Sequence, residues 1–211
     1  MVIAYHVIMS AYGFWLPNDP RGSWSDSIRK WELFRYGPAT KVNTRNSVAH
    51  VPHNRALREA AKEELDFPPV RFSEQQIQII AQGFVNYIEK SGVTFWAAAI
   101  LDDHFHAIFM RHRYKSEIVN NLLKGELTKA LVDAGQHPFG EFAKQGEAPP
   151  PCWGRKWWTV YIDNLDHLAQ AIPYVERNPE KEGKPRQHWP FVIPYPQTLA
   201  GFKALHLKKP V

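Results

Sequence analysis

The residues of this chain best suited to chemistry are a pair of histidines and, further along, a tyrosine and an asparagine. His104 and His106 flank one phenylalanine, and Tyr174 and Asn178 are four positions apart. Residues i and i+2 of a β-strand point to the same side, so the two imidazoles would share one face. Residues i and i+4 of an α-helix are neighbours, so the phenol and the amide would share one stripe. Brought together, these groups form a divalent-metal site beside a tyrosine hydroxyl, which can break a phosphodiester through a covalent phosphotyrosine.

The two histidines lie on a segment, 104–110, whose length and composition predict a β-strand. The residues that alternate with them are apolar: Phe105, Ala107 and Phe109. This alternation predicts a buried face on one side of the strand and both imidazoles on the other. Asp102 and Asp103 form a turn before the strand and add negative charge that would favour a cation. The alternative is that both histidines are structural, because the His-x-His spacing also arises by chance.

Tyr174 lies on a segment that predicts a helix beginning at Asn164 or Asp166. The apolar stripe expected to face the core consists of Leu165, Leu168, Ile172 and Val175. Tyr174 lies about 90° around the helix from that stripe, so the phenol is expected at the edge of the packed face. Asn178 has an alternative role as the end of the helix, because Pro179 follows it.

The segments around these two predict the order strand, helices, strand, strand, helix, strand, helix. Apolar or alternating runs predict strands at 3–11, 94–101, 104–110 and 157–162, the last with Trp158 pointing into the core. Periodic patterns predict helices at 56–65, 73–92 and 116–135, the middle one with a capping box of Ser73 and Gln76 and the last with Leu122 facing inward. A βαββαβ order predicts an α+β, ferredoxin-like fold: an antiparallel sheet with helices packed on one face, followed by the helix that carries Tyr174.

The overall composition indicates one globular domain over residues 1–211. The chain is 44% hydrophobic and carries a net charge of +5, which is compatible with a nucleic-acid partner. A single cysteine excludes both a disulfide within the chain and a thiolate metal cluster. The sequence shows no signal peptide and no apolar run of membrane-spanning length, so we expect a cytoplasmic protein. Long loops are expected near 12–55 and 136–156, and a basic tail near 195–211; no role can be assigned to 12–55 from its sequence.

Several stretches resemble one protein family. They are YHV at 5–7, HFHAIF at 104–109, KGELTKAL at 124–131, CWGRKWWTVYIDN at 152–164 and YVERNPEKEG at 174–183. Together they are similar to the single-tyrosine transposases with a His-hydrophobic-His (HUH) motif, and especially to the REP-associated tyrosine transposases of bacteria. The resemblance covers most of residues 1–11 and 73–190.

This resemblance implies a site and an activity. Tyr174 corresponds to the nucleophile, and His104, His106 and Asn178 correspond to the ligands of a divalent metal, Mg²⁺ or Mn²⁺. The expected activity is cleavage and rejoining of single-stranded or hairpin DNA through a 5′-phosphotyrosine. The family includes dimers and monomers, so a homodimer is one expected state.

Two departures from the family pattern keep other functions open. Asp102-Asp103 stands where the family often has Pro-Asn, and Pro173 either kinks the tyrosine helix or begins a new one. These features favour a second hypothesis, a catalytically inactive nucleic-acid-binding protein derived from a transposase. A third is a metal-dependent hydrolase in which water attacks and Tyr174 positions the substrate.

Basic and aromatic residues near the two site segments are candidates for DNA contacts. One group, Arg155, Lys156 and Trp157, precedes or begins the last strand. The other, Arg111, Arg113 and Lys115, follows the histidine strand. Cations would meet phosphates, and tryptophan would stack on unpaired bases. The alternative is that these side chains are solvated or structural.

Overall fold

The centre of the molecule is a four-stranded antiparallel sheet. The computed structural model describes residues 1–44 and 47–196. The strands lie in the order β2–β3–β1–β4 and comprise β1 (Ala4–Ser10), β2 (Phe95–Ile100), β3 (His104–Met110) and β4 (Trp158–Ile162). β3 lies between β2 and β1, and β1 lies between β3 and β4, so the two βαβ halves of the chain interleave their strands. This is the strand order of a ferredoxin-like unit. The predicted α+β fold and all four predicted strands are confirmed.

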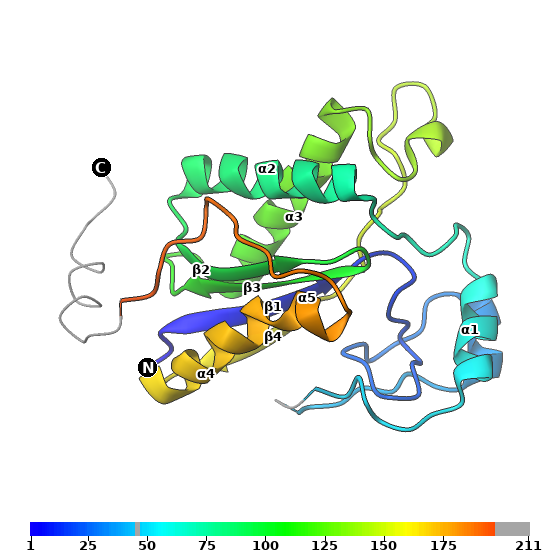
Figure 1. Ribbon diagram of the computed structural model, residues 1–211. Helices are drawn as coiled ribbons and strands as arrows, with labels where there is room; N and C mark the ends of the chain where they lie inside the picture. Colours follow the sequence, from blue (N-terminus) through cyan, green and yellow to red (C-terminus); the bar gives the residue numbers. More distant parts are fainter. Residues whose placement is uncertain (45–46, 197–211) are drawn as a thin grey trace.

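Helices α2 (Glu74–Ser91) and α3 (Ser116–Asp133) cover one face of this sheet (Figure 1). The predicted capping box is present, since the Ser73 hydroxyl accepts from the Gln76 amide and the Gln76 side chain accepts from the Ser73 amide. Gly92 ends α2 in the left-handed conformation, with φ of 70°. Leu122 is 48% exposed, so the prediction that it faces inward is wrong. It lies one residue before Leu123, which takes the buried position on the same turn.

Helices α4 (Leu165–Glu176) and α5 (Asn178–Lys181) lie across the opposite face of the sheet (Figure 1). Asn164 caps α4 by accepting a hydrogen bond from the His167 amide. The helix packs through Leu168, Ala171 and Val175 on apolar residues of β1–β4, among them Trp96 and Ile108. The tyrosine helix is therefore fixed to the sheet face that lies opposite α2 and α3.

The long segment after β1 forms its own small unit beside the sheet (Figure 1). It contains η1 (Trp31–Tyr36), a 3-10 helix that the sequence did not predict, and α1 (Arg55–Glu63), close to the predicted helix at 56–65. Its buried apolar residues are Leu16, Ile28, Leu33 and Ala61. A second 3-10 helix, η2 (Gly140–Phe142), interrupts the loop at 136–156. The apolar cluster of Leu16, Ile28, Leu33 and Ala61 gives the insertion after β1 a defined shape despite its irregular backbone.

Residues 197–211, most of the predicted basic tail, lie outside the described residues. Within the described part of the chain, none of the helices has both the length and the apolar character needed to span a membrane.

Candidate active site

The face of β3 that meets α4 carries both predicted histidines. Phe105 and Phe109 point to the α2 and α3 side and are fully buried, so His104 and His106 point to the other side. Both histidines are also covered, with exposed fractions of 9% and 4%. A third histidine, His6, reaches the same face from β1 and is 7% exposed.

Each of the paired imidazoles is held at its Nδ1 atom. His104 Nδ1 lies 2.7 Å from Asp103 Oδ1, and His106 Nδ1 lies 2.9 Å from His6 Nε2. Because a carboxylate only accepts, His104 donates through Nδ1 and offers the lone pair of Nε2. Burial lowers the pKa of His6 to about 4 and holds the pKa of His106 well below its usual value. His6 and His106 are therefore neutral near pH 7, the state that a metal ligand requires.

The phenol of Tyr174 lies beside these imidazoles. The Tyr174 ring centroid is 6.0 Å from that of His106 and 6.0 Å from that of His6. Lys181 Nζ lies 3.6 Å from the centre of the same ring, so a cation covers one face of the phenol. Helix α4 continues through Pro173, whose carbonyl accepts from the Arg177 amide at 3.1 Å. A new helix therefore does not begin at Pro173.

The side chains that follow Tyr174 supply oxygen donors. Asn178, the first residue of α5, is 6% exposed and lines the same cavity as Tyr174. Glu182 follows one helical turn later, and its carboxylate, Asp103 and His104 have ligand atoms within 4.8 Å of one another. His106 is not one of those three residues. Glu182 is not among the predicted site residues, although its spacing of four from Asn178 is a signal in the sequence that could have indicated it.

The two carboxylates of the acidic turn before β3 share Arg71 but differ in their other partners. Asp102 pairs with Arg71 at 2.8 Å and with Lys184 at 2.9 Å. Burial favours a raised pKa for Asp102, but these two cations together hold the pKa below its usual value. Asp103 also lies 3.3 Å from Arg71, but its other oxygen contacts His104, so Asp103 is the carboxylate that acts on the histidine pair.

The donor set fits a divalent metal of the harder kind. Asp103, His104 and Glu182 offer one imidazole nitrogen and two carboxylate oxygens within 4.8 Å of one another, and His106 and Asn178 line the same groove as His104 and Glu182. Mixed nitrogen and oxygen donors suit Mn²⁺ and, with fewer protein ligands, Mg²⁺. The buried sulfur of Cys152 belongs to the α2 and α3 side of the sheet and cannot contribute.

His104, His106, Asn178 and Glu182 line a groove of about 1100 Å³. The groove is bounded by the histidine face of the sheet, by α4 and α5, and by the insertion after β1. Its charged lining residues, among those that the structure describes, are the cations Arg21, Lys124, Arg155, Lys156 and Lys181 and the anion Glu182. A groove with this excess of positive charge attracts a polyanion.

Aromatic rings of the groove come from both the sheet and the insertion. The Trp158 ring lies 4.6 Å from that of Trp24, so Trp158 faces the groove and the prediction that it points into the core is wrong. The cause is strand register: Trp158 pairs with Ile8, whose side chain shares the histidine face. Phe14 stacks parallel to His104, with centroids 5.2 Å apart. The insertion therefore forms one wall of the site.

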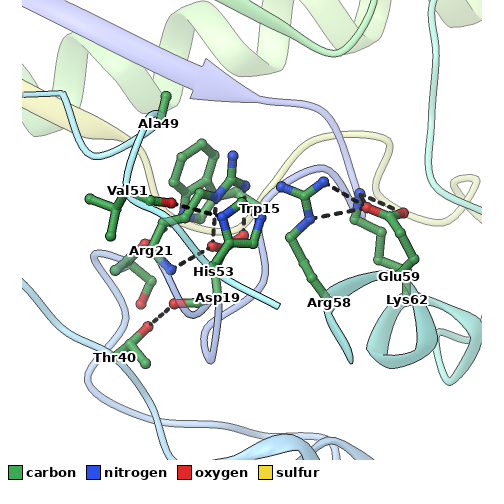
Figure 2. A network of polar contacts seen from close by, with 12 residues as sticks. Trp15, Asp19, Arg21, Thr40, Ala49, Val51, His53, Arg58, Glu59 and Lys62 are labelled. Atoms are coloured by element: carbon green, nitrogen blue, oxygen red, sulfur yellow. Dashed lines mark hydrogen bonds and ion pairs between the residues drawn. The ribbon is translucent and has the colours of Figure 1, made fainter. Parts of the chain in front are cut away.

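A buried ion pair braces that wall, as Figure 2 shows. Arg21 donates to both carboxylate oxygens of Asp19, at 2.8 and 2.7 Å, and its guanidinium lies 3.9 Å from the Trp15 ring centre. The Trp15 indole donates to the Gly22 carbonyl at 2.7 Å. Because Asp19 neutralises Arg21, this cation contributes rigidity more than attraction for a phosphate.

The two predicted groups of DNA-contacting residues are placed differently. Arg155, Lys156 and Trp157 line the groove, and Lys156 also pairs with Asp26 of the insertion at 2.9 Å. The other group, Arg111, Arg113 and Lys115, follows the far end of β3, is exposed, and does not line the groove. Only the first group shares a surface with Tyr174 and the histidines.

Comparisons with known proteins give structural similarities at low sequence identity. No family model matches the sequence, and no curated protein matches it. A REP-associated tyrosine transposase bound to a REP hairpin is similar over 90% of this chain and 74% of that chain, with 13% identity and a TM-score of 0.48. A protein from Deinococcus radiodurans R1 described as a transposase is similar over 84% and 91%, with 11% identity and a TM-score of 0.36. At these values neither similarity carries an argument about function, which must come from the geometry of this chain.

Proposed function

We propose that this chain is a metal-dependent transposase or endonuclease that cleaves and rejoins single-stranded or hairpin DNA through a 5′-phosphotyrosine. The observation that carries the proposal is the position of Tyr174 beside His106, within a groove that is rich in cations and aromatic rings. A nucleophile, neutral imidazoles and a polyanion-binding surface are the parts that phosphodiester transfer needs.

In the proposed first step, the Tyr174 hydroxyl oxygen attacks the scissile phosphorus. The phenol proton passes to water, the new O–P bond joins Tyr174 to the 5′ phosphate, and the bond from phosphorus to the 3′ oxygen breaks. The departing 3′ oxygen takes up a proton and becomes a free hydroxyl. Covalent capture retains the energy of the phosphodiester, so a 3′ hydroxyl can later reverse the step and rejoin a strand.

The side chains around Tyr174 each have a defined part in this step. His104, His106 and Asn178 would hold the metal, with Glu182 close enough to His104 to join them. The chemistry that a bound divalent ion would supply is polarisation of a non-bridging phosphate oxygen and stabilisation of the charge that develops on it. Lys181, over the Tyr174 ring, fixes the phenol and favours negative charge at that position.

The lining of the groove supports unpaired DNA as the proposed substrate. Trp24 and Trp158 present aromatic rings to the groove, Trp157 lines it while packing partly against the apolar core, and Arg155 and Lys156 offer charge to the backbone. Stacking of an unpaired base on an aromatic ring contributes about 1–3 kcal/mol, whereas paired bases in a duplex do not expose their faces.

The test is covalent trapping on a denaturing gel. Protein is incubated with Mn²⁺ and a single-stranded oligonucleotide labelled at either its 3′ or its 5′ end. We expect the 3′-labelled fragment to migrate with the protein and the 5′-labelled fragment to be released, because Tyr174 would retain the 5′ phosphate.

Two variants make this test specific. Tyr174→Phe removes only the hydroxyl and should abolish the adduct. Tyr161→Phe is the matched control, because Tyr161 is 44% exposed on β4 and packs on Tyr5, away from the histidines. An adduct that persists in Tyr174→Phe, or that carries the 5′ label, would refute the proposed nucleophile or the proposed polarity.

A second candidate function is nucleic-acid binding without catalysis. The group of Asp103, His104 and Glu182 favours it, because His106, the second proposed imidazole ligand, is not part of that group. A binding protein would shift the mobility of the oligonucleotide on a native gel yet leave it intact and unlinked after denaturation. The same gel series therefore separates the two functions.

A further inference from the structure

His6 lies at the centre of the histidine face, on the strand next to that of the proposed ligands. It is 7% exposed and points to the same side of the sheet as His106. The rings of His6 and His106 lie 5.2 Å apart with an interplanar angle of 30°. The His6 ring is also 6.0 Å from that of Tyr174. His6 thus touches both parts of the proposed site.

The contact between His6 Nε2 and His106 Nδ1, at 2.9 Å, permits two arrangements of one proton. Either His106 donates through Nδ1, or His6 donates through Nε2. In the first arrangement His106 Nε2 has a free lone pair. In the second, neutral His106 carries its proton on Nε2 and cannot bind a metal through that atom. Only the first arrangement makes His106 a ligand through Nε2.

His104 provides an internal comparison for this contact. Its Nδ1 donates to Asp103, so both histidines of the pair have a partner at Nδ1 and both leave Nε2 for the site. Groups that bind the second nitrogen of a ligand histidine fix its ring and its tautomer. Asp103 does this with a negative charge, whereas His6 does it with a neutral lone pair.

We propose that His6 is a positioning residue of the metal centre, which holds His106 with its Nε2 lone pair directed into the site. His6 has this role only if His106 binds the metal, as the proposed function requires. Loss of such a partner typically weakens metal affinity by about 10–100-fold. Replacement of His6 by an apolar residue should therefore weaken Mn²⁺ binding within that range.

The experiment measures Mn²⁺ affinity without DNA, from the electron paramagnetic resonance signal of the free ion. His6→Leu removes the acceptor at similar volume. His6→Gln retains one, because the glutamine amide extends about as far as Nε2 of histidine and its oxygen can accept from His106. Val7→Ala is the control for stability, because Val7 is buried in the same strand but faces α2 and α3.

We expect a 10–100-fold loss of Mn²⁺ affinity in His6→Leu, affinity within about threefold of wild type in His6→Gln, and no change in Val7→Ala. Raising the Mn²⁺ concentration should restore the covalent adduct in His6→Leu, which a simple folding defect would not allow. Wild-type affinity in His6→Leu, equal losses in both His6 variants, or an equal loss in Val7→Ala would each overturn the role of His6.

The variant His106→Ala distinguishes an error in the role of His6 from an error in the proposed metal centre, on which that role depends. His106→Ala should abolish specific Mn²⁺ binding. If His106→Ala binds Mn²⁺ as tightly as wild type, or if wild type does not bind it, the proposed metal centre is wrong and the role of His6 falls with it. If His106→Ala loses binding and His6→Leu does not, only the role of His6 is wrong.

Discussion

The two faces of the central sheet are built from the same strands but differ in chemistry. Towards α2 and α3, β1 and β3 present Val7, Phe105 and Phe109, which are almost completely buried in a large apolar cluster. Towards α4, the same two strands present His6 and His106, which are also buried but are polar. Because side chains alternate along a strand, one face can stabilise the fold while the other carries reactive groups held by hydrogen bonds.

The largest expected effect is on the apolar face. Phe105 packs edge-to-face on Phe84 and Trp153, with ring centroids 5.3 and 5.7 Å apart. Phe105→Ala would leave a cavity and should lower the free energy of unfolding by about 3–5 kcal/mol. Chemical denaturation measures this change. Mn²⁺ affinity of the fraction that remains folded should be close to that of wild type, and a specific loss of affinity would mean that the two faces are not independent.

His106 is next to Phe105 in the sequence but lies on the opposite face of the sheet, and its replacement should affect metal binding more than stability. His106→Ala should abolish specific Mn²⁺ binding and reduce formation of the covalent adduct at least ~100-fold, because a proposed ligand is lost. Its cost in stability should be smaller, about 1–3 kcal/mol, mainly from leaving His6 Nε2 without its partner.

Removal of the metal by a chelator tests independently whether formation of the covalent adduct depends on a divalent ion. Ethylenediaminetetraacetate should abolish the adduct in wild type, and added Mn²⁺ should restore it. Thermal unfolding should change little in the same samples, since the apolar face holds the fold together without a metal. Adduct formation that continues in excess chelator would contradict a metal-dependent mechanism.

The sheet and its two faces could be predicted from the sequence because they depend on local patterns. Alternation in 104–110 gives the buried and polar faces of β3, and the spacing around Ser73 gives the start of α2. The edge position of Tyr174 also follows from helical periodicity. These patterns need no knowledge of which distant segments come together.

The remaining features of the site depend on contacts between distant segments. His6 meets His106 only because β1 pairs with β3 in one register, and Trp158 faces the groove only because β4 pairs with β1. The insertion is the clearest case, since Phe14 reaches His104 through a loop whose path has no periodic signal. Register and loop path are set by tertiary packing, which a single sequence does not reveal.

The smallest predicted effect is a change of stability with pH that comes from the thiol of Cys152, on the α2 and α3 side of the sheet. Cys152 is fully buried in the α2 and α3 cluster, and burial raises its pKa to about 12 despite the opposing effects of a backbone hydrogen bond and of Lys124. A thiol in the unfolded chain ionises near pH 9. Because the folded pKa is the higher one, the stabilisation from the neutral thiol is complete below pH 9 and is lost between pH 9 and about 12.

This shift can be measured against Cys152→Ala, which has no thiol to ionise. The difference in unfolding free energy between wild type and the variant should narrow by about 1 kcal/mol from pH 8 to pH 10. Native protein should also resist thiol reagents at pH 8 until it is unfolded. A difference in unfolding free energy that stays constant across this pH range, or rapid modification of the native thiol, would mean that water reaches the apolar face. The two faces would then differ in the types of their residues but not in their access to water.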